Sequence, residues 1–216
     1  MLKIGLTGNV CSGMDKVGDL FKTLGVPVFD ADVALKFIIN YREDVIRLLK
    51  GQFGKDIYNN GIIDGSKFNT PKFNVLLDIA QIELLKLYES WRFFNKDASY
   101  TIFKSSILFE RGLDSLMNYT ISSFLPKNER AVEVAKKYGI RLVEACDVVE
   151  DEMDELEKNK KATFIIHTYD NLSIISQTRD THEKIESKSI KRILDKMDSI
   201  GGYDPYRESS IRNIFT

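Results

Sequence analysis

The 216-residue chain has little of what marks disulfide-stabilised or nucleic-acid-binding proteins. It contains only two cysteines, Cys11 and Cys146, which are too few and too far apart in sequence to predict a disulfide framework. Its 31 basic and 32 acidic residues leave a formal net charge of −1, without a long basic block. We therefore expect no nucleic-acid partner and no surface for anionic membranes.

Long apolar runs are also missing. No segment approaches about 18 uncharged apolar residues, and the first residues lead directly into a short apolar strand, so we predict neither a membrane span nor a signal peptide. His167 and His182 have no neighbouring cysteine or carboxylate at metal-ligand spacing, so we predict surface or capping roles for both and no metal site. We expect a cytoplasmic protein.

The most informative feature that is present is the segment from Gly8 to Lys16, which reads GNVCSGMDK. A phosphate-binding loop has the pattern G-x-x-x-x-G-K-[ST], in which the lysine contacts the β- and γ-phosphates and the hydroxyl binds Mg²⁺. Both glycines are in place, at Gly8 and Gly13, but Met14 replaces the lysine and Asp15 replaces the hydroxyl residue. The sequence predicts the loop backbone without its two phosphate-site side chains.

Strand and helix signals alternate along the chain. A strand at 3–7, a helix at 15–24 and a strand at 26–29 form a βαβ unit, which implies a parallel sheet. Further strands are predicted at 100–103, 119–124 and 163–167, and helices at 31–39, 42–53, about 72–94, 126–161, 170–178 and about 183–198. We predict a doubly wound α/β domain, with 126–161 as a helical excursion from the sheet and 54–65 as a turn-rich connection.

Several motifs occur in a familiar order: LTGNVCSGMD at 6–15, LGVPVFDAD at 24–32, FG at 53–54 with GIID at 61–64, ILFE at 107–110, and ATFII at 162–166. Together they resemble the dephospho-CoA kinases, which transfer the γ-phosphoryl group of ATP to the ribose 3′-hydroxyl of dephospho-CoA. The resemblance extends from residue 2 to about 180. It implies a P-loop kinase domain with a helical lid over 1–180, followed by a C-terminal helix and tail over 181–216.

The departures from the family pattern gather where the chemistry would occur. In the loop, Asn9 and Cys11 replace glycines, Met14 replaces the lysine and Asp15 replaces the hydroxyl residue. Elsewhere, Lys104 replaces an aspartate, Ser106 a proline, Glu133 and Lys137 the lid arginines, and Thr168 an asparagine. Phosphoryl transfer depends on positioning and on electrostatic stabilisation, and removing one preorganised donor costs about 10²–10³ in rate. The resemblance therefore implies an inactive pseudoenzyme with a binding or assembly role.

The alternatives are a divergent active kinase, which would need ATP and Mg²⁺ and cations from Lys16, Lys104 or Lys137, and a sensor that binds a nucleotide or CoA-like ligand without turnover. For the active kinase the resemblance gives Asp30, as the base for the attacking hydroxyl, and Asp32; alternatively Asp30 only caps the next helix. The candidate ligand-binding residues are Gly8, Cys11, Ser12, Gly13, Met14, Asp15, Lys16 and Lys137.

Two of these residues carry further expectations. Lys16 lies two residues beyond Met14, a rotation of about 200° along a helix, so we expect it to point away from the mouth of the loop. Cys11 is either a reactive thiol, with a pKa lowered by loop amides, or a small residue that fills a glycine position.

Acidic residues dominate the segment from Glu144 to Glu157. They are Glu144, Asp147, Glu150, Asp151, Glu152, Asp154, Glu155 and Glu157. This segment is interpreted either as a solvated helix face or as a docking surface for a basic protein partner. The C-terminal helix is expected to pack either on the core or on a second chain, and Gly201, Gly202 and Pro205 predict a loosely held tail.

Overall fold

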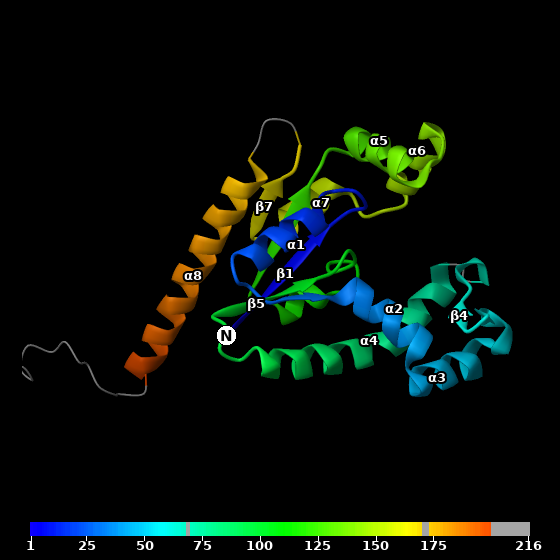
Figure 1. The fold of residues 1–216 in the computed structure, drawn as a ribbon, viewed down its shortest axis with the longest axis horizontal. Helices are drawn as coiled ribbons and strands as arrows, with labels where there is room; N and C mark the ends of the chain where they lie inside the picture. Colours follow the sequence, from blue (N-terminus) through cyan, green and yellow to red (C-terminus); the bar gives the residue numbers. More distant parts are fainter. Residues whose placement is uncertain (68–69, 170–172, 200–216) are drawn as a thin grey trace, which may run out of the picture.

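The computed structural model describes residues 1–67, 70–169 and 173–199. At its centre is a parallel five-stranded sheet with the strand order β2–β5–β1–β6–β7 (Figure 1). The strands are β1 (Leu2–Gly8), β2 (Val28–Asp30), β5 (Tyr100–Lys104), β6 (Tyr119–Phe124) and β7 (Phe164–His167). The central strands are buried along nearly their whole length, as expected where helices cover both faces of a parallel sheet. The predicted doubly wound α/β fold is confirmed.

One face of the sheet is covered by α1 (Met14–Thr23) and α8 (Ile174–Ser199). Val17 and Phe21 of α1 and Ile185 of α8 pack against strand residues such as Ile4 and Ile121, and all of these side chains are fully buried. This packing fixes α1, and with it the end of the glycine-rich loop, against the sheet.

The opposite face is covered by α2 (Ala31–Tyr41), α3 (Glu43–Phe53) and α4 (Thr70–Phe94), which confirms the predicted long helix. Phe29 and Phe103 of the sheet stack with ring centroids 5.8 Å apart, and Tyr88 of α4 packs edge-on against Phe103. The turn-rich connection contains a two-stranded hairpin of β3 (Tyr58–Asn59) and β4 (Ile62–Ile63).

The predicted helical excursion is also confirmed. It consists of α5 (Lys127–Tyr138), α6 (Leu142–Glu150) and α7 (Glu155–Lys161). Helices α5 and α6 form a small core of their own, to which Val10 and Cys11 of the glycine-rich loop contribute. The α5–α6 pair therefore packs directly on the loop, above the carboxyl ends of the strands (Figure 1).

The prediction of two C-terminal helices is wrong, because α8 runs without a break from Ile174 to Ser199. Its buried stripe includes Thr178, Thr181 and Ser189, whose hydroxyl groups bond to backbone carbonyls. A stripe carried by hydroxyl residues is not visible in a search for apolar periodicity. Residues 170–172 and the tail from 200 to 216 lie outside the described residues, and the division of the chain at residue 180 stays a prediction.

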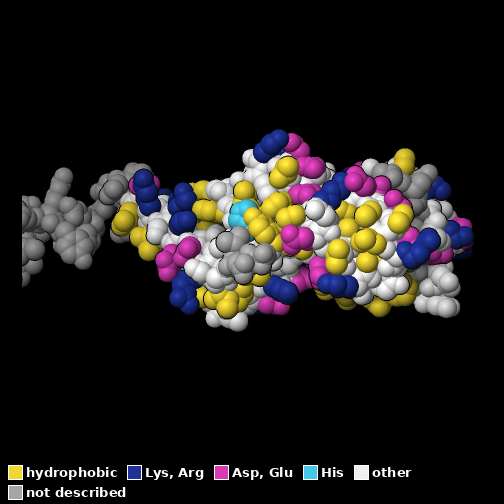
Figure 2. Space-filling model, turned by 90° about the horizontal axis from the view of Figure 1, so that it is seen from above, with side chains coloured by type: hydrophobic (Ala, Val, Ile, Leu, Met, Phe, Trp, Pro, Cys, Tyr) yellow, Lys and Arg dark blue, Asp and Glu magenta, His cyan; other side chains and the backbone are white. Residues whose placement is uncertain are grey.

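Within the described residues, no helix is both long enough and apolar enough to cross a membrane. On the face seen in Figure 2, basic and acidic side chains are interspersed, as the near-zero net charge leads one to expect.

Candidate functional site

The glycine-rich loop connects the end of β1 at Gly8 to the start of α1 at Met14. A Cβ atom on Gly8 would lie 2.1 Å from Ser123 Oγ and 2.3 Å from Ser12 Oγ, so only glycine allows this approach. Gly13 has φ of 82°, and a Cβ there would meet Thr168 at 3.0 Å. The structure thus retains the tight strand–loop–helix turn that the sequence predicts.

Cys11 occupies a position with φ of 57°, in the left-handed region that favours glycine. Burial raises the pKa of its thiol above the ordinary value, and the carboxylates of Glu133 and Glu152 raise it further against the opposing charge of Lys137. This direction does not support the alternative of a reactive thiol with a lowered pKa. The backbone angle supports the other interpretation, that a small side chain fills a glycine position.

A cavity of about 780 Å³ opens between the loop and α5. Its lining consists of residues 8–16, Ser106, Leu125, Asn128, Glu129, Val132, Glu133, Lys137, Thr168 and Tyr169. All eight residues predicted to bind a ligand are among them. Lys16 is included as well, and the direction of its side chain relative to the mouth of the loop stays a prediction. The volume falls in the range of about 300–1,000 Å³ that is common for small-molecule sites.

Behind the loop, Lys104 bridges two aspartates. Strand register pairs Lys104 of β5 with Asp30 of β2, and the Lys104 Nζ lies 2.6 Å from Asp30 Oδ2 and 2.5 Å from Asp15 Oδ1. The lysine side chain is 9% exposed, against 30% for Asp30 and 73% for Asp15. Burial alone would lower the lysine pKa, but the two carboxylates outweigh it and raise the pKa. We call this set the Asp15–Lys104–Asp30 bridge.

Neither candidate catalytic aspartate lines the cavity. Asp30 Oδ1 accepts a hydrogen bond from the Val33 amide at 3.1 Å and so caps α2, while its other oxygen contacts Lys104. Asp32 accepts hydrogen bonds from the Ser106 amide, and burial raises the pKa of its carboxyl group although those bonds oppose the rise. The structure therefore gives Asp30 its capping role and engages both of its oxygens within the chain.

The side chains at the loop do not fit Mg²⁺. Asp15 stands where the pattern requires a hydroxyl, and its Oδ1 contacts an ammonium group, so a positive charge already lies between the two carboxylates. Across residues 1–67, 70–169 and 173–199, no cluster of three or more histidine, cysteine or acidic side chains could hold a metal ion.

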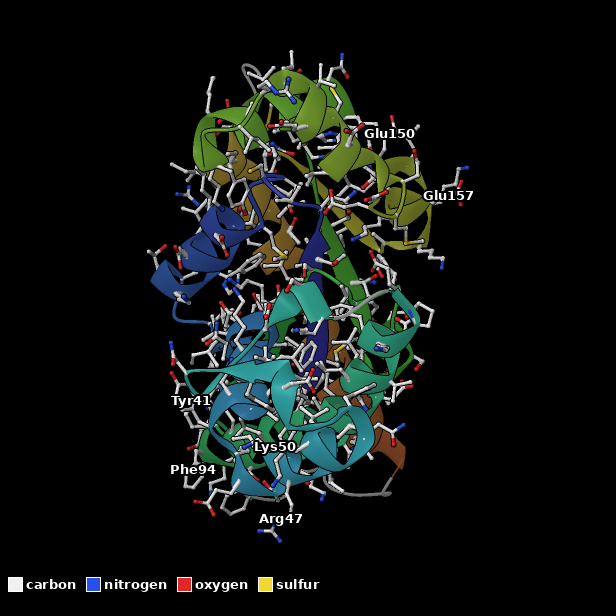
Figure 3. All side chains as sticks on the ribbon, turned by 90° about the vertical axis from the view of Figure 1, so that its right-hand side faces the viewer. Tyr41, Arg47, Lys50, Phe94, Glu150 and Glu157 are labelled. Carbon is white, nitrogen blue, oxygen red and sulfur yellow. The ribbon has the colours of Figure 1, made fainter. Side chains whose placement is uncertain are left out.

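Most acidic side chains of the segment have a partner within the chain. Figure 3 shows Glu150 and Glu157 on the side of the molecule formed by α5–α7. Six of the eight acidic side chains have partners: Glu144 with Arg141, Glu150 with Lys127, Glu152 and Glu155 with Arg130, Asp154 with amides at the start of α7, and Glu157 with Lys160. The interpretation as a solvated helix face misses the inward contacts of Glu152 and Glu155.

Two further polar residues near the site are not found by the sequence analysis. Arg130 is 1% exposed and lies between Glu152 and Glu155. Lys158 is likewise buried, and its Nζ reaches the Ser106 carbonyl and Glu110, both at 2.8 Å. An acidic segment followed by lysines is typical of a solvent-exposed surface. Nothing local in the sequence indicates that the side chains of Arg130 and Lys158 are buried.

The two histidines are half-buried, contrary to the expectation of surface or capping roles. His182 belongs to α8, and its Nδ1 lies 2.7 Å from the hydroxyl of Tyr100 on β5. His167 packs edge-on against Phe124 and Tyr169.

Comparison with known proteins agrees with this architecture. The profile of the dephospho-CoA kinase family matches residues 2–173. The chain is 28% identical over 178 residues to a dephospho-CoA kinase of Listeria innocua, covering 78% of this chain and 89% of that one. It is 32% identical over 145 residues to one from Porphyromonas gingivalis, covering 64% and 71%. The crystal structure of TT1252 from Thermus thermophilus superimposes with a TM-score of 0.72 at 22% identity, covering 85% and 96%.

Proposed function

Because this chain belongs to the dephospho-CoA kinase family, we propose that it is a member that has lost phosphoryl transfer and acts through binding. The observation that carries the proposal is the Asp15–Lys104–Asp30 bridge. It places an ammonium group beside the loop position where the family binds Mg²⁺, and it engages the aspartate that the family resemblance gives as the base.

The energetic argument is one of charge placement. The transferring phosphoryl group carries spread negative charge, and kinases stabilise it with a lysine and metal ions held in place before the reaction. Here Met14 removes the loop lysine, and the nearby Lys104 charge is balanced by two carboxylates. Glu129 and Glu133 add negative charge to the same cavity wall. Together, these features oppose phosphoryl transfer.

The cavity itself supports a retained ligand. Among the described residues no side chain caps the N-terminus of α1, so its amides stay free to meet an anion. Lys16 and Lys137 line the same space. We propose that an ATP-like or CoA-like ligand binds here without Mg²⁺ and without turnover.

For a protein partner, α8 is a better-supported surface than the acidic segment, whose side chains mostly pair internally. The C-terminal half of α8 extends past the sheet (Figure 1). Ile190, Ile193 and Leu194 are each more than half exposed on it. A photo-crosslinker at Ile193 should capture a partner in cells, whereas one at Val143, which is similarly apolar and 71% exposed on α6, should not.

A second candidate function rests on the placement of Lys16 and Lys137 in the cavity. If these cations replace the missing lysine, the protein is a divergent ATP-dependent kinase for dephospho-CoA or another nucleotide-like acceptor. This candidate needs Asp30 to be released from Lys104 during the reaction.

The experiment that separates the two is phosphorylation of dephospho-CoA by the purified protein with labelled ATP and Mg²⁺, beside D30N. We expect no product above the D30N background. Turnover in the ordinary kinase range of about 1–100 s⁻¹ that D30N abolishes would favour the divergent kinase. Thermal-shift measurements with ATP, ADP, CoA and dephospho-CoA test ligand binding separately, since a ligand at 100 times its Kd stabilises the folded state by about 2.7 kcal/mol.

A further inference from the structure

The segment between α6 and α7 closes directly onto the glycine-rich loop. Asn9 Nδ2 donates to the Met153 carbonyl at 2.7 Å, and the Val10 amide donates to Glu152 Oε1 at 2.7 Å. Consecutive residues of the loop thus meet consecutive residues of the helical segment. These contacts join parts of the chain more than 140 positions apart.

The Glu152 carboxylate also meets a buried cation. Its second oxygen, Oε2, lies 2.5 Å from Arg130 Nη1, and the Arg130 side chain is 1% exposed. One carboxylate therefore joins a loop amide to a guanidinium group, each through its own oxygen. Two converging donors of this kind, a backbone N–H and an arginine, are also how proteins hold a phosphate or sulfate.

We propose that the Val10 amide and the Arg130 guanidinium form an oxyanion site, and that the Glu152 carboxylate fills it as an internal ligand. The site suits a tetrahedral oxyanion such as inorganic phosphate. While Glu152 occupies it, the α5–α7 segment stays docked on the loop and that amide is closed to external anions. This inference concerns the docking of the segment, and it holds whether or not the chain transfers phosphoryl groups.

Glu155 provides the matched control. It also pairs with Arg130, at 3.2 Å through Nη2, but its other oxygen accepts from the Lys127 amide on α5 instead of from the loop. Removing Glu155 leaves Arg130 with Glu152 and leaves the Val10 amide satisfied. Removing Glu152 leaves both donors of the proposed site without that acceptor.

The test is phosphate titration of the thermal midpoint in E152A, E155A and the wild type, at constant ionic strength set with chloride. We expect E152A to be destabilised and then to regain a few degrees in a saturable response to phosphate, because an external anion replaces the missing carboxylate. Wild type and E155A should respond equally and less than E152A, because only the anion site at the start of α1 and the general stabilising effect of phosphate act on them.

A response of E152A no greater than those of wild type and E155A would overturn the proposal. If E152A does not fold, E152Q replaces it, since glutamine keeps the shape and the acceptor but not the charge. Phosphate should then stabilise E152Q more than the wild type, and equal responses would contradict the proposed site.

Discussion

Lys104 Nζ lies 2.6 Å from Asp30 Oδ2 and 2.5 Å from Asp15 Oδ1, so one ammonium group joins the residue that caps α2 to the first turn of α1. The contact follows from strand register, because β5 and β2 pair Lys104 with Asp30 at the carboxyl edge of the sheet. A lysine at this place holds two carboxylates together without a metal ion. Its loss should therefore affect stability as well as any ligand binding.

Replacing Lys104 by methionine should lower the free energy of unfolding by about 1–3 kcal/mol. The variant leaves Asp30, which is 30% exposed, without its cation, and a partly buried carboxylate loses more when its partner is removed than a fully exposed one does. The pair between Lys22 and Asp19, 55% and 70% exposed, gives a matched control. K22M should change stability by at most about 0.5 kcal/mol. Urea unfolding of both variants measures the difference, and equal losses would contradict the role given to Lys104.

Alanine at either loop glycine should destabilise the fold by at least about 1 kcal/mol. In G8A the new Cβ would meet buried hydroxyl groups, and in G13A it would sit at positive φ against Thr168. Gly51 in α3 has no atom within 4 Å of an added Cβ, and G51A should stabilise the helix by about 0.5–1 kcal/mol. Denaturant unfolding measures these free energies. A loss of stability in G51A as large as in G8A and G13A would contradict the close packing around the two loop glycines.

Alkylation of Cys11 should be slow at neutral pH. The thiolate is the reactive form, and burial raises the pKa of the Cys11 thiol, so the thiolate fraction stays small until the pH exceeds the ordinary cysteine value. The rate of iodoacetamide labelling in C146S, where Cys11 is the single thiol, should keep rising above about pH 9. A rate that levels off below pH 8 would show a lowered pKa. In the C11S variant, the labelling rate of the exposed Cys146 can be measured alone for comparison.

Restoring the loop pattern alone should not restore a working site. In M14K/D15S the loop regains its lysine and hydroxyl, but Lys104 still pairs with Asp30. We expect M14K/D15S/K104D to gain a larger thermal shift with ATP and Mg²⁺ than the double variant, because the third change removes the ammonium group and adds a carboxylate near Asp30. Equal thermal shifts for the double and the triple variant would contradict the view that the Asp15–Lys104–Asp30 bridge prevents binding of ATP with Mg²⁺.

The features that the sequence predicts well are local. The spacing of Gly8 and Gly13 after an apolar run places the loop between β1 and α1, and the motif order gives the family fold. The sequence also predicts part of the cavity lining, because half of the lining residues belong to the segment 8–16.

The features that the sequence does not show depend on contacts between distant segments. Lys104 was recognised as a departure from the family pattern, but its pairing with Asp30 and Asp15 depends on strand register. Glu152 reads as one acid among eight until the fold brings it to Val10 and Arg130. The continuity of α8 was missed for a related reason, because hydroxyl residues carry much of its buried stripe.

The central claim is that the Lys104 ammonium group takes the place of a metal ion beside the loop. Calorimetric titration of the wild-type protein with ATP, in Mg²⁺ and again in EDTA, tests it most directly. We predict that Mg²⁺ gives no gain, whether the nucleotide binds weakly or not at all. An affinity at least tenfold higher with Mg²⁺ would contradict the account.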